Sequence, residues 1–335
     1  MPELQKYLRN SLSVLFLSIF LPLFAIASVV FLIKLATYTA VIQLTVWEMA
    51  KLYFFILPEI LFYTSPISFF IAATLTLFKL SNDNEIVVLF ALGIHPKFIL
   101  KTFFTPALFL SIILIFDFFV LFPHAKVLSK NFISYKSSEA KFNLSASEFG
   151  HKFGEWLLYI GKNNPDGTYA DVILFNKKQK EEILIDAKKA QIINDSGILR
   201  LKLTNGEGYS YSKEKFTQID FETMFINDTM KTSLKTYKTA LEYWQDKDKH
   251  KKLITNILLT LFPIISLFLV ASIGIVHVRH QKGKVYLYLF VGLLVYDTLA
   301  IGLQSILSFY TIPALIITWL IATYTIYKKT IVAKF

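Results

Sequence analysis

The sequence predicts an α-helical membrane protein with six transmembrane helices and an inserted all-β, jellyroll-like domain. The 335-residue chain has 54% hydrophobic and only 18% charged residues, whereas soluble domains have about 25% charged residues. Several apolar stretches reach the length of about 20 residues that a membrane-spanning helix needs. The charged residues gather in the segment 126–252, which holds 22 of the 35 Lys and Arg and 17 of the 24 Asp and Glu.

Six apolar stretches are expected to span the membrane, three on each side of the polar segment. Each has about 19 to 24 residues, enough to cross the hydrocarbon as a helix. Asp117 and Asp297 are the only acidic residues within them. This pattern predicts membrane domains at 1–125 and 253–335. The stretches are Leu12–Ile33, Ile60–Phe78, Thr102–Pro123, Leu253–Val276, Val285–Leu303 and Ile306–Tyr327.

The basic residues of the short loops predict the orientation, because such residues accumulate on the cytoplasmic side. Lys34 and Lys51 are the only basic residues of the short loops on one side. We therefore expect both termini in the cytoplasm and residues 126–252 outside it. The basic residues of the opposite side are Lys6, Arg9, Lys79, Lys97, Lys101, Arg279, Lys282, Lys284, Lys328, Lys329 and Lys334.

The segment 126–252 is expected to form a small sandwich or jelly roll, followed by a partly helical connector from about residue 238. Leu199, Leu201 and Leu203 alternate with Arg200 and Lys202, as in a strand with one apolar face. An open groove on that face would suit an amphiphilic ligand, and a closed core without a ligand is an equal alternative. The other expected strands are 156–160, 169–175 and 183–185, with turns at 164–167, 194–197 and Asn205-Gly206.

The loop between the second and third stretches predicts a short cytoplasmic helix, 82–93. Asn82 and Glu85 have the spacing of a capping box, and Gly93 with Pro96 is a typical end signal. A helix of about 15 Å is too short to span a membrane. Its apolar face would either dock on a partner protein or lie among the lipid headgroups. That face consists of Ile86, Leu89, Phe90 and Gly93.

Charged residues within or beside the apolar stretches are further candidates, since such residues are rare and costly in a membrane. Lys34, Asp117 and Asp297 could line a water-filled cavity. Alternatively, Lys34 and Asp117 extend toward the interface, and Asp297 forms a hydrogen bond between helices.

Motifs for nucleotide binding, zinc-dependent hydrolysis and serine hydrolase chemistry are absent from the sequence. There is also no cysteine. We therefore expect no catalytic residues, no metal site and no bound cofactor in this chain, which argues against an enzyme acting by itself.

Nearly the whole chain resembles the LptF/LptG permeases of the lipopolysaccharide export ABC transporter. The most specific likeness covers Pro58-Glu59-Ile60, Ser65-Pro66-Ile67 and the run from Leu77 through Ile94. The loop 280–284 and the N-terminal residues Tyr7 and Arg9 also fit the family pattern, although Lys6 replaces an arginine and His95 replaces the usual Ser or Thr.

The resemblance implies a subunit of the Gram-negative inner membrane that has no nucleotide site, with ATP used by an LptB-like ATPase dimer. The short helix would sit in a groove of that ATPase, and a second LptF/LptG-type subunit would complete a cavity for lipopolysaccharide. The lipid would enter near Lys34 and pass through the periplasmic domain to LptC-like and LptA-like jellyrolls. The ATPase-coupling residues would be Asp83, Glu85, Ile86, Leu89, Phe90 and Gly93, and the substrate-binding residues Lys34, Asp297, Leu199, Leu201 and Leu203.

Two other functions stay open on the residues alone. A secondary transporter would need interrupted helices and a charged site at the membrane midplane, to which Asp297 could contribute. A membrane-anchored periplasmic binding or assembly module would have no transport cycle. An ATPase that copurifies with the chain would argue against both.

Overall fold

A computed structural model of the chain shows two compact units. Unit 1 comprises Met1–Ile33, Tyr53–Lys126 and Tyr237–Phe335, and unit 2 comprises Lys34–Leu52 and Val127–Thr236. The structure describes all residues except 43, 143–150, 154–155, 165–166, 179–180, 196–197, 213–214, 228–239, 247–248, 277–283 and 334–335.

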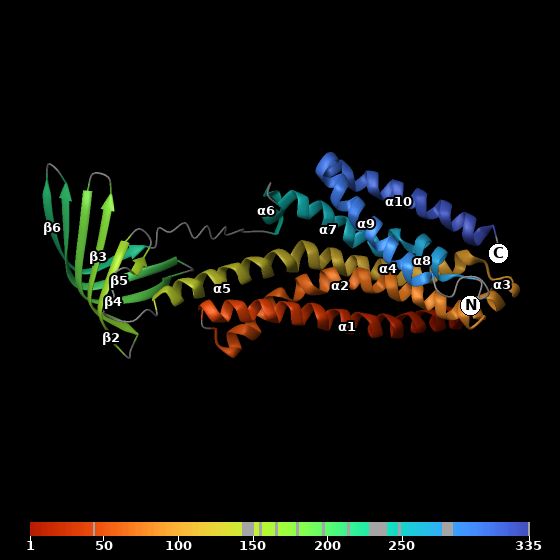
Figure 1. Cartoon of the computed structure of the whole chain (residues 1–335), viewed down its shortest axis with the longest axis horizontal. Coiled ribbons are helices and arrows are strands. Elements are labelled where there is room, and N and C mark those ends of the chain that lie inside the picture. Colours follow the sequence, from red (N-terminus) through yellow and green to blue (C-terminus); the bar gives the residue numbers. More distant parts are fainter. Residues whose placement is uncertain are drawn as a thin grey trace. The chain divides into compact units, whose positions relative to one another are not determined.

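The apolar stretches are helical, as expected for a backbone that must satisfy its own hydrogen bonds in hydrocarbon. Together with the sheet whose strands lie between α5 (Phe122–Phe142) and α6 (Ala240–Gln245) in the sequence, they confirm the predicted fold class, a helical membrane protein with a β domain (Figure 1). The helices and helical turns are α1 (Pro2–Ile42), α2 (Val46–Asn82), α3 (Glu85–Ala91), α4 (Pro96–Phe116), the π-helical turn η1 (Asp117–Leu121), α5 (Phe122–Phe142), α6 (Ala240–Gln245), α7 (His250–Ile265), α8 (Leu267–Gly274), α9 (Val285–Leu307), η3 (Ser308–Tyr310), α10 (Thr311–Tyr327) and η4 (Lys328–Val332).

The structure does not confirm the number of six spans. In the described part of the chain, four helical stretches are long and apolar enough to cross a membrane, or five when the bent pair α7–α8 is counted as one. One of the four stretches is Val285–Val332, which contains both α9 and α10. Five stretches rather than six are therefore obtained because the expected spans Val285–Leu303 and Ile306–Tyr327 are counted as one.

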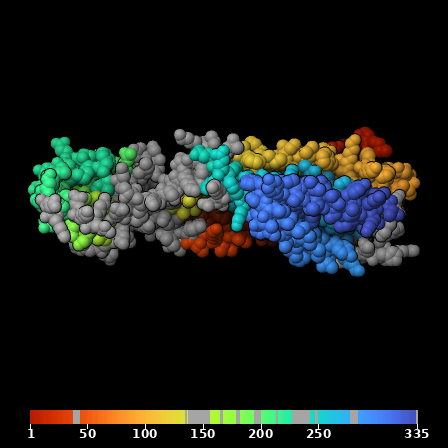
Figure 2. All heavy atoms as spheres, turned by 90° about the horizontal axis from the view of Figure 1, so that it is seen from above, coloured from red at the N-terminus to blue at the C-terminus, as the bar shows by residue number. Residues whose placement is uncertain are grey.

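The short break between these two spans also shifts a predicted boundary. The expected span Ile306–Tyr327 begins too early, because α9 continues through Leu307 and α10 starts at Thr311. Ser308 between them has a positive φ of 49°, and no charged residue marks the reversal in the sequence. The two helices run back along each other in Figure 1 and form one continuous surface in Figure 2.

The expected span Leu253–Val276 is a bent pair of helices rather than one straight helix. The axes of α7 and α8 differ by 49°, and Ser266 lies at the break. The Trp319 indole N–H of α10 donates a hydrogen bond to the Ser266 hydroxyl over 3.2 Å. The bend is therefore held from a neighbouring helix.

Helix α2 lies in the middle of unit 1, whereas α1 packs along its side (Figure 1). In α2, 67% of the most apolar stretch is buried inside the chain, but in α1 only 6% is. Phe16 of α1 contacts Phe69 of α2, and the Ser28 and Tyr53 hydroxyls share a hydrogen bond of 2.9 Å. Most of the apolar surface of α1 is therefore available to lipid or to another protein.

Gly274 of α8 allows a close approach to α2, which leads to a stability prediction. A Cβ atom at this position would lie 2.7 Å from both Leu77 Cβ and Thr74 O. We expect Gly274→Ala to push α8 away from α2 and to cost about 1–3 kcal/mol, as overpacking does. Thermal unfolding in detergent measures the loss. Gly302→Ala on α9 is the matched control, because nothing lies within 4 Å of its added Cβ, and an equal loss there would contradict the packing argument.

Unit 2 contains a six-stranded antiparallel sheet in the order β1-β2-β3-β4-β5-β6. The expected strands around 156–160, 169–175, 183–185 and 199–203 all lie within it. The sheet is strongly curved (Figure 1) and buries one apolar face, which includes Leu158, Leu174, Leu201 and Leu203. The strands are β1 (His151–Phe153), β2 (Trp156–Asn163), β3 (Thr168–Lys178), β4 (Glu181–Asp195), β5 (Ile198–Ser212) and β6 (Phe216–Asn227).

The prediction of a turn at Asn205-Gly206 is wrong, because both residues lie inside β5. Asn205 has a φ of 54° and interrupts the strand pairing at that residue without reversing the chain. Gly206 fits there because an added Cβ would meet the Phe221 ring at 2.6 Å. The Asn-Gly signal thus marks a local distortion of a long strand, which is a second use of such residues in sheets.

Candidate functional site

Glu85 starts the short helix α3, but it does not take part in the predicted capping box. Helix α2 continues through Asn82, and Asn84 precedes α3 with a left-handed φ of 62° and no side-chain cap. The capping-box interpretation of Asn82 and Glu85 is therefore wrong. The helix is also shorter than the predicted 82–93, because it spans Glu85–Ala91.

The Glu85 carboxylate instead has a partner on α1. The Tyr7 hydroxyl donates a hydrogen bond of 2.8 Å to Glu85 Oε2. This bond joins residues 78 positions apart, so no local pattern in the sequence could have indicated it. A shallow pocket of about 280 Å³ lies beside the contact, lined by Leu4, Tyr7, Asp83, Asn84, Glu85, Val88 and Leu89.

The apolar residues of α3 divide between the core and the surface. Ile86 is fully buried, and Leu89 and Phe90 are half-buried. The exposed apolar side chains are Val88, at 54%, and Leu92, at 73%. The surface that α3 offers to a partner therefore includes Val88 and Leu92, which the sequence pattern did not single out, together with exposed Asp83 and half-exposed Glu85.

The end of α3 follows the predicted stop signal. Gly93 has a φ of +80°, and the Ile94 N–H donates to Leu89 O over 3.0 Å, as in a glycine-terminated helix. His95 then caps α4 by accepting a hydrogen bond from the Lys97 N–H, and Pro96 is the first helical residue. Histidine thus performs at this position the capping that Ser or Thr usually performs.

Lys34 and Asp297 are both exposed, and they belong to different units of the chain. Lys34 lies on α1 and Asp297 on α9. The neighbour Tyr296 points the other way, since it is buried and its hydroxyl donates to Leu258 O over 2.7 Å. An exposed carboxylate on a helix of this apolar character indicates a partner or a hydrated cavity on that face.

Asp117 differs from these two because it is buried. It begins the π-helical turn η1, only 6% of its surface is exposed, and neither carboxylate oxygen has a hydrogen-bond partner in the described part of the chain. Neighbouring Phe118 packs on Trp244 of α6 with ring centroids 4.4 Å apart. The burial of Asp117 inside the chain argues against the alternative in which its side chain extends toward the membrane interface.

In the sheet, Leu201 and Leu203 are fully buried in the apolar cluster of unit 2. Arg200 and Lys202 between them are half-exposed, as the alternation predicts. The side chain of Leu199 lies outside the described residues. Leu201 and Leu203 thus belong to the packed face of the sheet.

A family model described as "Lipopolysaccharide export system permease LptF/LptG" matches residues 6–326, nearly the whole chain. No curated protein matches the chain.

Proposed function

Because the chain belongs to the LptF/LptG family of lipopolysaccharide export permeases, we propose that it extracts lipopolysaccharide from the inner membrane with energy from a separate ATPase. In this proposal α3 docks on an LptB-like ATPase dimer in the cytoplasm. A second LptF/LptG-type subunit faces α1, and the β domain receives the lipid in the periplasm. LptC-like and LptA-like jellyrolls then take the lipid onward.

The observation that carries the proposal is the apolar face of the curved sheet. A single antiparallel sheet normally has one solvated face and one packed face. Here the packed face contains Leu158, Leu174, Leu201 and Leu203, and all the described residues of its apolar cluster belong to strands. Acyl chains could pack against these side chains in place of the contacts that the side chains make with one another. This apolar face therefore supports a passage for lipid.

Exposed residues of α3 and α1 support the proposal that these helices bind the ATPase and the second subunit. Val88 and Leu92 give α3 an apolar patch beside Asp83 and Glu85, which suits a groove with basic residues. The exposed side of α1 carries Val14, Leu17, Leu21, Val29 and Val30. A helix whose own chain buries so little of it suits the wall of a cavity shared between two subunits.

The bend between α7 and α8 is the one feature that a secondary transporter would share. The Ser266 side chain at the break meets Trp319 of α10, and Asp117 and Asp297 belong to other helical segments. The family assignment favours export by a permease over this alternative and over an anchored module without a transport cycle.

The test is photocrosslinking within β5. With a photoreactive residue at 201 or 203, we expect capture of lipopolysaccharide only when ATP and the ATPase are present. Position 202 should capture at least about tenfold less, since successive side chains of a strand point to opposite faces. Gel mobility of the crosslinked product with an antibody against the lipid measures the yield.

Equal crosslinking at 201 and 202 would indicate unspecific contact. Capture at none of the three positions, together with wild-type export, would mean that the sheet has an ordinary closed core and that the lipid takes another route.

A further inference from the structure

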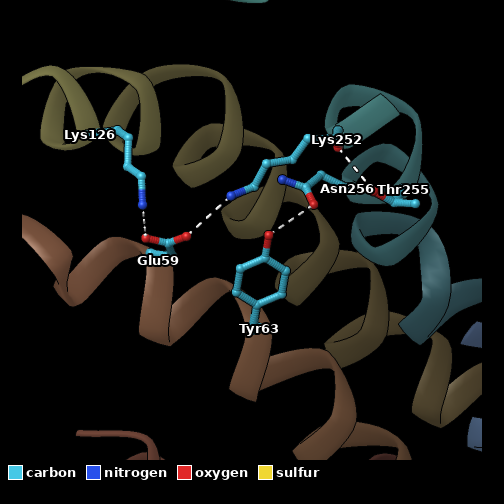
Figure 3. Close-up of polar contacts among 6 residues, drawn as sticks. All are labelled: Glu59, Tyr63, Lys126, Lys252, Thr255 and Asn256. Carbon is cyan, nitrogen blue, oxygen red and sulfur yellow. Dashed lines mark hydrogen bonds and ion pairs between the residues drawn. The ribbon is translucent and has the colours of Figure 1, made fainter. Parts of the chain in front are cut away.

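A single carboxylate on α2 pairs with two lysines of unit 1 that lie on either side of the β domain in the sequence: Lys126, after which the chain leaves unit 1, and Lys252, which follows its return to unit 1 at Tyr237. Glu59 Oε2 accepts an ion-pair hydrogen bond from Lys126 Nζ at 2.7 Å, and Glu59 Oε1 lies 3.2 Å from Lys252 Nζ (Figure 3). Lys126 is the fifth residue of α5, and Lys252 lies in the first turn of α7. The 125 residues between these lysines include the whole sheet.

The surroundings strengthen these ion pairs beyond an ordinary surface contact. The side chain of Glu59 is only 21% exposed, and partly buried pairs are less screened by water and salt. Lys252 Nζ also lies 4.7 Å from the centre of the Phe122 ring. One turn further along α2, the Tyr63 hydroxyl donates to Asn256 Oδ1 over 3.3 Å and adds a second link to α7 (Figure 3).

The helix that carries Glu59 leads directly to the candidate docking helix. From Glu59 to Asn82 the chain is helical without interruption, a distance of about 35 Å at 1.5 Å per residue. Helix α3 follows after two residues. Near this end, the Ser81 hydroxyl donates to Gly274 O of α8 over 3.2 Å. Helix α2 therefore connects the docking helix at its C-terminal end with the junction of Lys126 and Lys252 about 35 Å away.

We propose that Glu59 is a positioning residue that holds both ends of the 127–251 segment on α2, so that movement of α2 reaches the two ends together. The proposal rests on the proposed function, in which the ATPase acts on α3. Glu59 touches neither the ATPase nor the lipid in this role. It ties the hydrolysis of ATP to the delivery of lipid into the β domain.

The first test measures how much lipopolysaccharide is captured at position 201 for each ATP hydrolysed. In Glu59→Gln, we expect hydrolysis within about twofold of wild type. Capture per ATP should fall about tenfold, the effect of about 1.4 kcal/mol. Lys126→Gln and Lys252→Gln each remove one of the two ion pairs of Glu59, and each should reproduce part of the loss. A loss in Glu59→Gln that neither lysine variant reproduces would mean that Glu59 acts on something other than these lysines.

Glu48→Gln is the matched control. Glu48 also lies on α2 and pairs with a lysine of α5, since its Oε1 lies 2.7 Å from Lys136 Nζ, but no contact with α7 involves it in the part of the chain that the structure describes. We expect capture per ATP in this variant to stay within about twofold of wild type. A tenfold loss in Glu48→Gln would overturn the special role of Glu59.

A second measurement judges Glu59 independently of transport. The chain has no cysteine, so His124→Cys and Lys251→Cys place two spin labels on exposed positions next to the two lysines. We expect one narrow distance distribution, which broadens in Glu59→Gln and broadens to a smaller extent in Lys126→Gln and in Lys252→Gln. An unchanged distribution in Glu59→Gln would overturn the proposal. If the wild-type complex captures no lipid with ATP, the proposed function fails, and the spin labels still decide whether Glu59 holds the two ends.

Discussion

Replacing Glu85 with alanine is expected to separate the permease from its ATPase while the chain still folds and inserts. In the proposed complex Glu85 pairs with a basic residue of the ATPase groove. Truncation of one partner of a desolvated charge pair at an interface costs about 2–5 kcal/mol, or a dissociation constant at least about 30-fold higher. Copurification of the ATPase and lipid-stimulated ATP hydrolysis both measure this loss.

Tyr7→Phe and Ile86→Ala distinguish the causes of such a loss. Tyr7→Phe removes only the hydroxyl that donates to Glu85, so it should weaken docking by less than Glu85→Ala. Ile86 is fully buried, and its truncation should lower stability by about 2–5 kcal/mol. If Glu85→Ala retains full ATPase binding and activity, the role of Glu85 is limited to its hydrogen bond with Tyr7.

Reversing the charge at Lys34 is the second change for which we expect a large effect. Lys34 is exposed on α1, and a lysine at the outer leaflet can meet the phosphates of lipid A. Hydrogen bonds to charged groups contribute about 1.5–3 kcal/mol, and aspartate would replace that attraction with repulsion. We therefore expect Lys34→Asp to lower ATP-dependent release of lipopolysaccharide from proteoliposomes by more than about tenfold.

Lys51→Asp is the control for this charge reversal. Lys51 is also exposed and lies near the start of the next helix, α2, but its ammonium lies 5.4 Å from the centre of the Phe132 ring. Release by this variant should stay close to wild type. A photocrosslinker at position 34 that captures only bulk phospholipid would show that Lys34 merely extends to the interface.

The features that the sequence predicted well depend on strong local signals. Long apolar stretches become helices because hydrocarbon offers no other partner for the backbone, and β5 alternates Leu201 and Leu203 with polar residues because it has one packed face. Gly93 ended α3 as expected, since glycine adopts a positive φ without strain.

The features that the sequence did not predict depend on contacts between distant residues. Glu85 fits the spacing of a capping box, but Tyr7, which lies 78 residues away, takes its carboxylate. Asn205-Gly206 has the composition of a turn, but its neighbours on β4 and β6 keep it inside a strand. Lys252 belongs to the predicted connector that begins at about residue 238, and only the fold shows that it meets Glu59. Pairings of this kind leave no periodic trace in a single sequence.

The shallow packing of α1 has a consequence for how such permeases diversify. Because only 6% of its most apolar stretch is buried inside the chain, substitutions on its outer side change the free energy of folding very little. Natural variation can therefore alter this helix without rebuilding the rest of the molecule. Selection on α1 comes mainly from the proteins and lipids that contact it. A duplicated copy of the gene could therefore acquire a different partner subunit or lipid preference through changes in this one helix.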